Sequence, residues 1–191
     1  LSLLLLVIIS SFILRFYNHS YDDLWFDEVL SFWISDPELS LKESLYNHNL
    51  VDVSTFAYHL ILKYYFFLFG YSVESGRLLS VIIGSLSVLS VSYLNWIIVR
   101  NKSYLFTTFL VGFNIFLISF SQEMRMYSML FFFSSISLIF FLILLDKNKI
   151  YYLISFFLFT ILIVLLHPFA LIILFSYSFY LAYIFMQTKK I

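Results

Sequence analysis

The chain has 191 residues, of which 62% are hydrophobic and only 12% are charged, and it has no net charge and no cysteine. A soluble domain carries about 25% charged and about 45–50% apolar residues, so this composition excludes a wetted globular surface, a disordered chain and a basic nucleic-acid-binding module. Without cysteine there is no disulfide framework, thiolate zinc site or cysteine nucleophile. The sequence therefore predicts an all-α, polytopic membrane protein.

Intervals without charged residues place the predicted transmembrane helices. An ionisable side chain at the bilayer centre costs several kcal/mol, and a span needs about 20 apolar residues. The last uncharged interval, 150–188, is too long for one crossing, and His167-Pro168 divides it because proline favours a helix start. We expect six spans, at about 1–17, 78–99, 103–121, 127–145, 150–166 and 169–187.

Both ends of the chain lie close to apolar spans. Leu1 is already inside an apolar run, and Ile191 directly follows a predicted span and its Lys189-Lys190 flank. We therefore expect residues 1–191 to be one membrane-embedded part of a longer protein.

Basic residues in the short linkers predict the orientation of the spans. Linkers 100–102, 146–149 and 188–191 are separated from one another by two spans each, so they share one side of the membrane. Lysine and arginine dominate these linkers, and the positive-inside rule makes that side cytoplasmic.

Segment 55–69 is apolar but short, and it contains His59 and Lys63. If it crosses the membrane, the acidic stretch 18–54 is cytoplasmic; if it lies flat in the interface, 18–76 is one long external loop. The positive-inside rule alone leaves both arrangements open. The flat arrangement is favoured because a short run carrying a lysine snorkels more easily than it spans.

Two polar clusters lie in or next to this loop. Asp27 and Glu28 are adjacent and follow Trp25 and Phe26. Such a pair can supply a general base with an electrostatic or metal-binding partner, or it can simply face the dipole at a helix N-terminus. Glu74 and Arg77 form either an i,i+3 surface pair or part of a site that holds an anion.

Two further clusters occupy tight corners on the same predicted side. Glu123, Arg125 and Tyr127 are squeezed between apolar spans, where ionisable groups must be paired or hydrated and are functional candidates. His167 is either an ordinary corner residue or a catalytic one. Convergence of four polar clusters on one face of an apolar bundle indicates an active site at the external membrane surface.

The order of these motifs resembles a known family. Leu24-Trp25-Phe26-Asp27-Glu28, then Glu74-x-x-Arg77, then Gln122-Glu123-x-Arg125-Met126-Tyr127 and finally His167 look like the N-terminal half of polytopic glycosyltransferases of the GT-C superfamily. The nearest branch is the bacterial one grouped with dolichyl-phosphate-mannose protein mannosyltransferases and lipopolysaccharide galacturonosyltransferases.

The resemblance implies a GT-C type helix bundle whose first external loop carries a juxtamembrane helix matching 55–69. It implies that Asp27 is the catalytic acidic residue with Glu28 as its partner. The residues implied to line the donor and phosphate cavity are Arg77, Glu123, Arg125, Tyr127 and His167. Relatives commonly carry a Pro-Pro-Leu-Tyr-Tyr type stretch before the juxtamembrane helix, whereas this chain reads Val53-Ser54-Thr55-Phe56-Ala57-Tyr58, so the donor contacts of that stretch do not carry over.

The activity implied is inverting transfer of a sugar from a polyprenyl-phosphate donor to a hydroxyl of a lipid, glycan or protein, at the outer face of a bacterial inner membrane. The sequence has no glycine-rich loop for a nucleotide sugar, and no nucleic-acid partner is expected. No cofactor or metal ligand is assigned, although a divalent cation held by Asp27 and Glu28 stays open. The alternative is a transporter or non-catalytic membrane subunit with an acidic external loop; transporters, however, tend to keep ionisable groups near the midplane of their spans.

Overall fold

The computed structural model describes residues 2–52 and 55–188, and the regular elements in these ranges are all helical. The elements are α1 (Ser2–Phe16), α2 (Phe26–Ile34), α3 (Leu41–Val51), α4 (Ala57–Phe69), α5 (Val73–Val99), α6 (Tyr104–Gly112), α7 (Ile115–Gln122), α8 (Tyr127–Lys147), α9 (Ile150–Leu166), the 3-10 turn η1 (Pro168–Ala170) and α10 (Leu171–Thr188).

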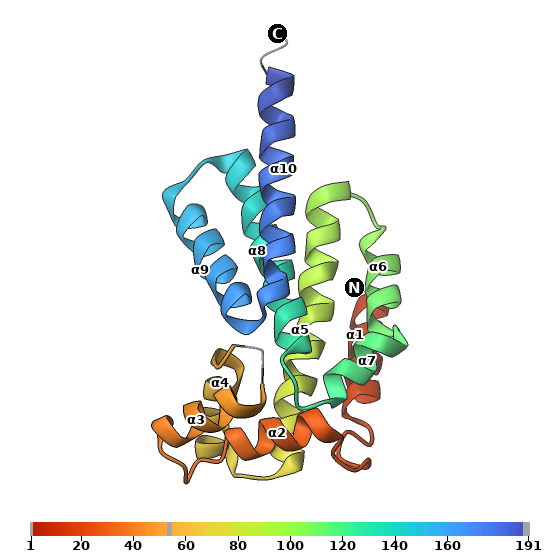
Figure 1. Cartoon of the computed structure of the whole chain (residues 1–191). Coiled ribbons are helices and arrows are strands. Elements are labelled where there is room, and N and C mark those ends of the chain that lie inside the picture. Colours follow the sequence, from red (N-terminus) through yellow and green to blue (C-terminus); the bar gives the residue numbers. More distant parts are fainter. Residues whose placement is uncertain (1, 53–54, 189–191) are drawn as a thin grey trace.

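The longer helices form a bundle, and three short helices cover one end of it. Figure 1 shows α5, α8, α9 and α10 running roughly along the bundle, with α1 and α6 beside α5, while α2, α3 and α4 gather at the end opposite the C-terminus. This end is called the capped end below. Helix α8 packs mainly against α9 and α5.

Within residues 2–52 and 55–188, three helical segments are long and apolar enough to cross a membrane: Val73–Val99, Tyr127–Lys147 and Pro168–Gln187. The bent pair α6 and α7 brings the number to four if the two helices together make one span. Helices α1 and α9 are also apolar, but with 15 and 17 residues they are shorter than these three segments. An all-helical fold with helices able to span a membrane is thus confirmed, while the number of six spans and the GT-C type of bundle stay predictions.

Segment 103–121, which we expected to be one span, is divided into two helices that meet at an angle of 54°. Asn114 causes the break, because its side chain accepts a hydrogen bond from the Leu117 amide (3.1 Å) and so starts α7. The free carbonyls at the end of α6 are satisfied by Arg15 of α1, which donates to Val111 (3.1 Å) and Gly112 (2.7 Å).

Small residues bring the bundle helices close together. A Cβ added at Gly84 of α5 would lie 2.7 Å from the Cβ of Ser121 of α7, so only glycine permits this approach. Ser137 of α8 is hydrogen-bonded to Thr160 of α9 (2.9 Å) and to Tyr177 of α10 (3.2 Å). Such contacts are typical of helix packing in membranes, where apolar burial alone does not drive association.

Helix α4 lies across the capped end rather than along the bundle (Figure 1). Its 13 residues make a helix about 20 Å long, which is too short for a hydrocarbon layer of about 30 Å. The Lys63 ammonium donates to the carbonyl of Asp36, which joins α4 to the turn between α2 and α3. A flat position of α4 in the membrane interface, and the side of the membrane on which it lies, both stay predictions.

The principal core cluster attaches α4 to the bundle. Tyr58, Leu62 and Phe66 line one face of α4 at helical spacing and are buried. They pack against residues of α5, α8, α9 and the corner before α8, namely Leu79, Leu166, Met124, Met126 and Met129. Unbranched methionine side chains fill the irregular space in this corner. The same packing fixes the position of segment 123–126, which carries predicted site residues.

Candidate functional site

The charged residues predicted to share one site do meet at the capped end. The first turn of α2, the first turns of α5 and the corner between α7 and α8 come together there, although they lie up to 98 residues apart in sequence. Asp27, Glu28, Arg77, Glu123 and Arg125 all belong to these segments. They fall into two neighbouring ion pairs and one half-buried carboxylate.

Glu28 and Arg77 form a fully buried, two-pronged ion pair. The Arg77 guanidinium donates to both carboxylate oxygens, at 2.9 and 2.6 Å, and the two side chains are 1% and 4% exposed. The remaining donors of Arg77 bind the main-chain carbonyls of His19, Asp22 and Asp23, while the Met124 amide donates to Glu28 (2.7 Å). This pair therefore joins the α1–α2 loop, α5 and the 123–126 corner.

Asp27 is the accessible member of the second pair. Its carboxylate is 35% exposed and lies 3.7 Å from the guanidinium of Arg125, which is only 6% exposed. Arg125 also donates to the Ser31 hydroxyl (3.0 Å) and to the Asp27 carbonyl (3.3 Å). A buried cation thus holds a carboxylate that water or a ligand can reach.

Arg125 continues into a second polar group formed by α3 and α4. It donates to the Asp52 carboxylate (3.4 Å), which also accepts a hydrogen bond from Nε2 of His59 (3.2 Å). Burial lowers the pKa of His59, opposed by its bond to Asp52. The imidazole of His48 lies against that of His59, with ring centroids 5.2 Å apart. The sequence analysis did not select His48 or Asp52.

Glu123 lies in a polar cavity of about 260 Å³ beside the Glu28–Arg77 pair. The cavity is lined by the α1–α2 loop, α2, α5 and α7, including Asp22, Asp23 and Gln122. Burial, and next the neighbouring charge of Glu28, raise the pKa of Glu123 above its ordinary value. The Ser119 hydroxyl donates to the Glu123 carboxylate at the long distance of 3.5 Å, so Glu123 retains freedom to bind a ligand in the cavity.

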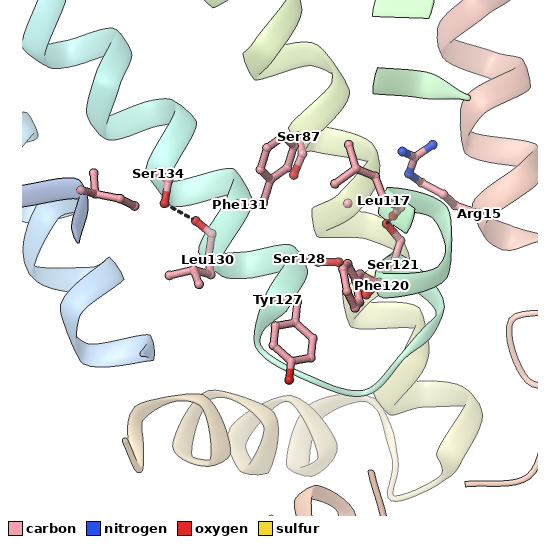
Figure 2. A pocket seen from close by; sticks show the side chains of 12 residues that line it. Arg15, Ser87, Leu117, Phe120, Ser121, Tyr127, Ser128, Leu130, Phe131 and Ser134 are labelled. Atoms are coloured by element: carbon pink, nitrogen blue, oxygen red, sulfur yellow. Dashed lines mark hydrogen bonds between the residues drawn. The ribbon is translucent and has the colours of Figure 1, made fainter. Parts of the chain in front are cut away.

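Tyr127 lies at the boundary between the capped end and the bundle. It lines an apolar cavity of about 360 Å³ between α5, α7, α8 and α10. Figure 2 shows Tyr127 at one end of this cavity with its hydroxyl directed away from the apolar lining, and Arg15 at the opposite side. The tyrosine ring packs on Phe120, with centroids 5.0 Å apart.

His167 has a local structural contact. Its Nδ1 accepts a hydrogen bond from the Phe169 amide (3.1 Å), which caps η1. It lies next to the buried Leu166 of the core cluster, and its contacts in the described part of the chain are local ones. Glu74 is exposed in the first turn of α5. Arg77 pairs with Glu28, so the structure does not support the i,i+3 surface pair that was one of the two interpretations of Glu74 and Arg77.

The residues do not fit a metal ion shared by Asp27 and Glu28. Both oxygens of Glu28 face the Arg77 guanidinium, and one of them also accepts from the Met124 amide. A bidentate arginine contact leaves such a carboxylate poorly placed to coordinate a cation. This geometry argues for an orienting role of Glu28 in the fold.

Local folding explains why Asp27 and Glu28 differ. Helix α2 begins at Phe26, so both acids lie in its first turn, where the helix dipole favours negative charge. Successive residues on a helix point about 100° apart, and one therefore faces the bundle while the other faces the surface. The helix N-terminus position is confirmed for both acids, while the role of Asp27 as a general base stays a prediction.

Comparison of the chain with models of protein families, with curated proteins and with solved structures finds no match.

Proposed function

We propose that the protein is a membrane glycosyltransferase that moves a sugar from a polyprenyl-phosphate donor to a hydroxyl acceptor at the capped end. The proposal rests above all on Asp27, a partly exposed carboxylate held by a buried arginine directly beside apolar helices. It rests also on the order of motifs that resembles the GT-C superfamily. The capped end faces outward in this proposal, with the basic linkers inside.

Asp27 is the general base in the proposed reaction. Its carboxylate takes the proton of the acceptor hydroxyl, whose oxygen attacks the anomeric carbon. The bond between that carbon and the phosphate oxygen breaks, polyprenyl phosphate leaves with the electron pair, and the configuration inverts. Since phosphate leaves as an anion, a strong general acid is unnecessary. Arg125 orients Asp27, because its own donors face Asp27, Ser31 and Asp52.

The apolar cavity suits the lipid part of such a donor. Leu117, Phe120 and Phe131 line it within the bundle, and Tyr127 closes it toward the capped end. A polyprenyl chain entering sideways from the bilayer would place its phosphate near the Tyr127 hydroxyl and its sugar toward Asp27. Cavities of about 300–1,000 Å³ are typical of small-molecule sites.

The transporter alternative is less well supported by the distribution of charge. The ionisable Asp, Glu, Lys and Arg residues of the three candidate spans are Glu74 and Arg77 near the start of α5, and Asp146 and Lys147 at the end of α8. Transporters tend to place such groups near the bilayer midplane.

Release of polyprenyl phosphate from a panel of polyprenyl-phosphate hexoses and pentoses, with a cell-envelope extract as acceptor, tests the proposal. We expect one donor of the panel to be consumed. Asp27→Asn should lower the rate by about 10²–10⁴-fold, the usual contribution of a general base. Glu38→Gln, which alters an exposed acid of the same loop, is the matched control and should keep the wild-type rate. Unchanged turnover by Asp27→Asn, or no turnover of the whole panel, would overturn the proposal.

A further inference from the structure

His48, Asp52 and His59 form a compact group of potential metal ligands at the capped end. One ligand atom from each residue lies within 4.8 Å of those of the other two. His48 and Asp52 are placed by the last turn of α3, where the Asp52 amide donates to the His48 carbonyl (2.9 Å). His59 belongs to the first turn of α4. Two helices therefore present their ligands to one point.

Both imidazoles carry a buried nitrogen without a hydrogen-bond partner. His48 is 4% and His59 is 1% exposed, and Nδ1 of each ring is buried and unpaired in the described part of the chain. An unsatisfied buried polar atom costs about 1–3 kcal/mol. Packing alone does not explain two such atoms side by side, because apolar residues of similar size would fill the space without this cost.

The donor set has the chemistry of a transition-metal site. Two imidazole nitrogens and one carboxylate are ligands typical of zinc, and three protein ligands occur in zinc sites that keep one position for water. In a tetrahedral site with bonds of about 2.0–2.1 Å, neighbouring ligand atoms lie about 3.3 Å apart. Nε2 of His59 and Oδ2 of Asp52 are already 3.2 Å apart.

We propose that His48, Asp52 and His59 bind one divalent transition-metal ion, with zinc as the best fit. The ion links the end of α3 to the start of α4 through these three ligands. Asp52 lies between the ion and Arg125, so the site is connected through Arg125 to Asp27. The site differs from the Asp27–Glu28 arrangement in its ligands and in its position, and its occupation does not depend on sugar transfer.

Titration of the chelator-treated, detergent-purified protein with Co²⁺ tests this proposal, because bound Co²⁺ absorbs visible light and occupies zinc sites. The chain has no cysteine and only four histidines, so the background is low. We expect one Co²⁺ per chain, displaced by Zn²⁺ but not by Mg²⁺ or Ca²⁺, which prefer oxygen ligands. A wild-type protein that binds no stoichiometric Co²⁺ would overturn the proposal.

Single variants assign the ligands. His48→Gln and His59→Gln should each raise the half-saturating Co²⁺ concentration at least tenfold, whereas His19→Gln, which alters another buried histidine of the capped end, should leave it unchanged. His48→Gln is the decisive variant if His59→Gln does not fold, because the contacts described for the His48 side chain are ring contacts rather than hydrogen bonds. Wild-type affinity in a folded His48→Gln protein would overturn the assignment.

A second readout follows the stability of the fold. Zn²⁺ should raise the Tm of the wild-type protein and of His19→Gln, since a ligand that binds only the native state stabilises it. The same concentration should leave the Tm of folded His48→Gln nearly unchanged. An equal rise of Tm in all three proteins would mean that Zn²⁺ binds elsewhere and would overturn the proposal.

Discussion

The Glu28–Arg77 and Asp27–Arg125 pairs use adjacent acids of one helix turn, yet they differ in geometry and in access to water. The first is bidentate, at 2.6 and 2.9 Å, and almost completely buried. The second is long, at 3.7 Å, and its carboxylate is 35% exposed while its arginine is buried. Both arginines are held in place by further contacts with main-chain carbonyls.

This difference separates a structural task from a chemical one. In a buried ion pair whose donors and acceptors are all hydrogen-bonded within the protein, no group is available to a substrate. Removing one partner, however, leaves an uncompensated charge in the protein interior. Substituting a partly exposed carboxylate costs the protein little stability, yet such a carboxylate can contact a substrate. Neighbouring carboxylates in one sequence motif are therefore expected to respond in opposite ways to mutation.

The largest effect is expected for Glu28→Gln. The substitution keeps the volume but leaves the buried Arg77 without its counter-charge, which should lower the free energy of unfolding by about 3–5 kcal/mol. Thermal or denaturant unfolding of the purified protein in detergent measures this loss. Glu74→Gln is the control, because Glu74 is exposed in the same region, and should stay within about 0.5 kcal/mol. Equal stability of the two variants would contradict the structural role of Glu28.

Arg125→Lys should have an intermediate effect. Lysine keeps the charge but loses the planar fork that contacts Asp27, Ser31 and Asp52. We expect the free energy of unfolding to fall by about 1–3 kcal/mol, the scale of hydrogen bonds to charged groups. The same unfolding measurement tests this. An unchanged unfolding midpoint combined with lost donor turnover would instead favour Arg125 as a ligand of the donor phosphate.

Asp27→Asn should change stability least among the ion-pair variants. A partly exposed ion pair contributes about 0–1 kcal/mol, so the unfolding midpoint should stay near that of the wild type while sugar transfer is lost. Measuring both quantities on one preparation separates the two pairs directly. A stability loss as large as that of Glu28→Gln would show that Asp27, too, is structural.

Glu123 offers the finest test, because it belongs to neither pair. Its pKa is raised by burial in the folded protein, so the native state holds this proton more firmly than the unfolded state. The contribution of Glu123 to stability is therefore present below pH about 4.5, its unfolded value, and is lost as pH rises through the higher folded pKa. Glu123→Gln should remove this decline in unfolding curves recorded from pH 4 to 8, and a steeper decline in the variant would contradict it.

The sequence predicts the fold class and the end of the bundle at which charged residues collect better than it predicts the partners in each ion pair. Uncharged intervals located all three long candidate spans, because the bilayer penalises charge whatever the neighbours are. The alternation of helix direction then placed Asp27, Arg77 and Arg125 at one end. Arg77, however, has an acid three residues before it, and only the long-range approach of the first turn of α2 to the first turn of α5 decides that Glu28 is its partner.

Two further features were not predicted from the sequence: the break between α6 and α7, and the group formed by His48, Asp52 and His59. The break between α6 and α7 has a local signal, Gly112 followed by Asn114, since these residues are common at helix ends and starts, but hydropathy across 103–121 does not register it. His48 and Asp52 are four residues apart, a spacing that can place two metal ligands on one helix face. The third residue, His59, lies in the next helix, and only the packing of α3 and α4 brings it to the other two.

The contact between Arg15 and the end of α6 has a consequence for biosynthesis. Arg15 leaves the ribosome about 97 residues before Gly112, whose carbonyl it binds in the finished fold. Neither α6, with 9 residues, nor α7, with 8, is long enough to insert alone. We therefore expect the Arg15 guanidinium to stay hydrated at the lipid headgroups until the α6–α7 segment has been synthesised, so that α1 and the α6–α7 segment insert together rather than in order of synthesis.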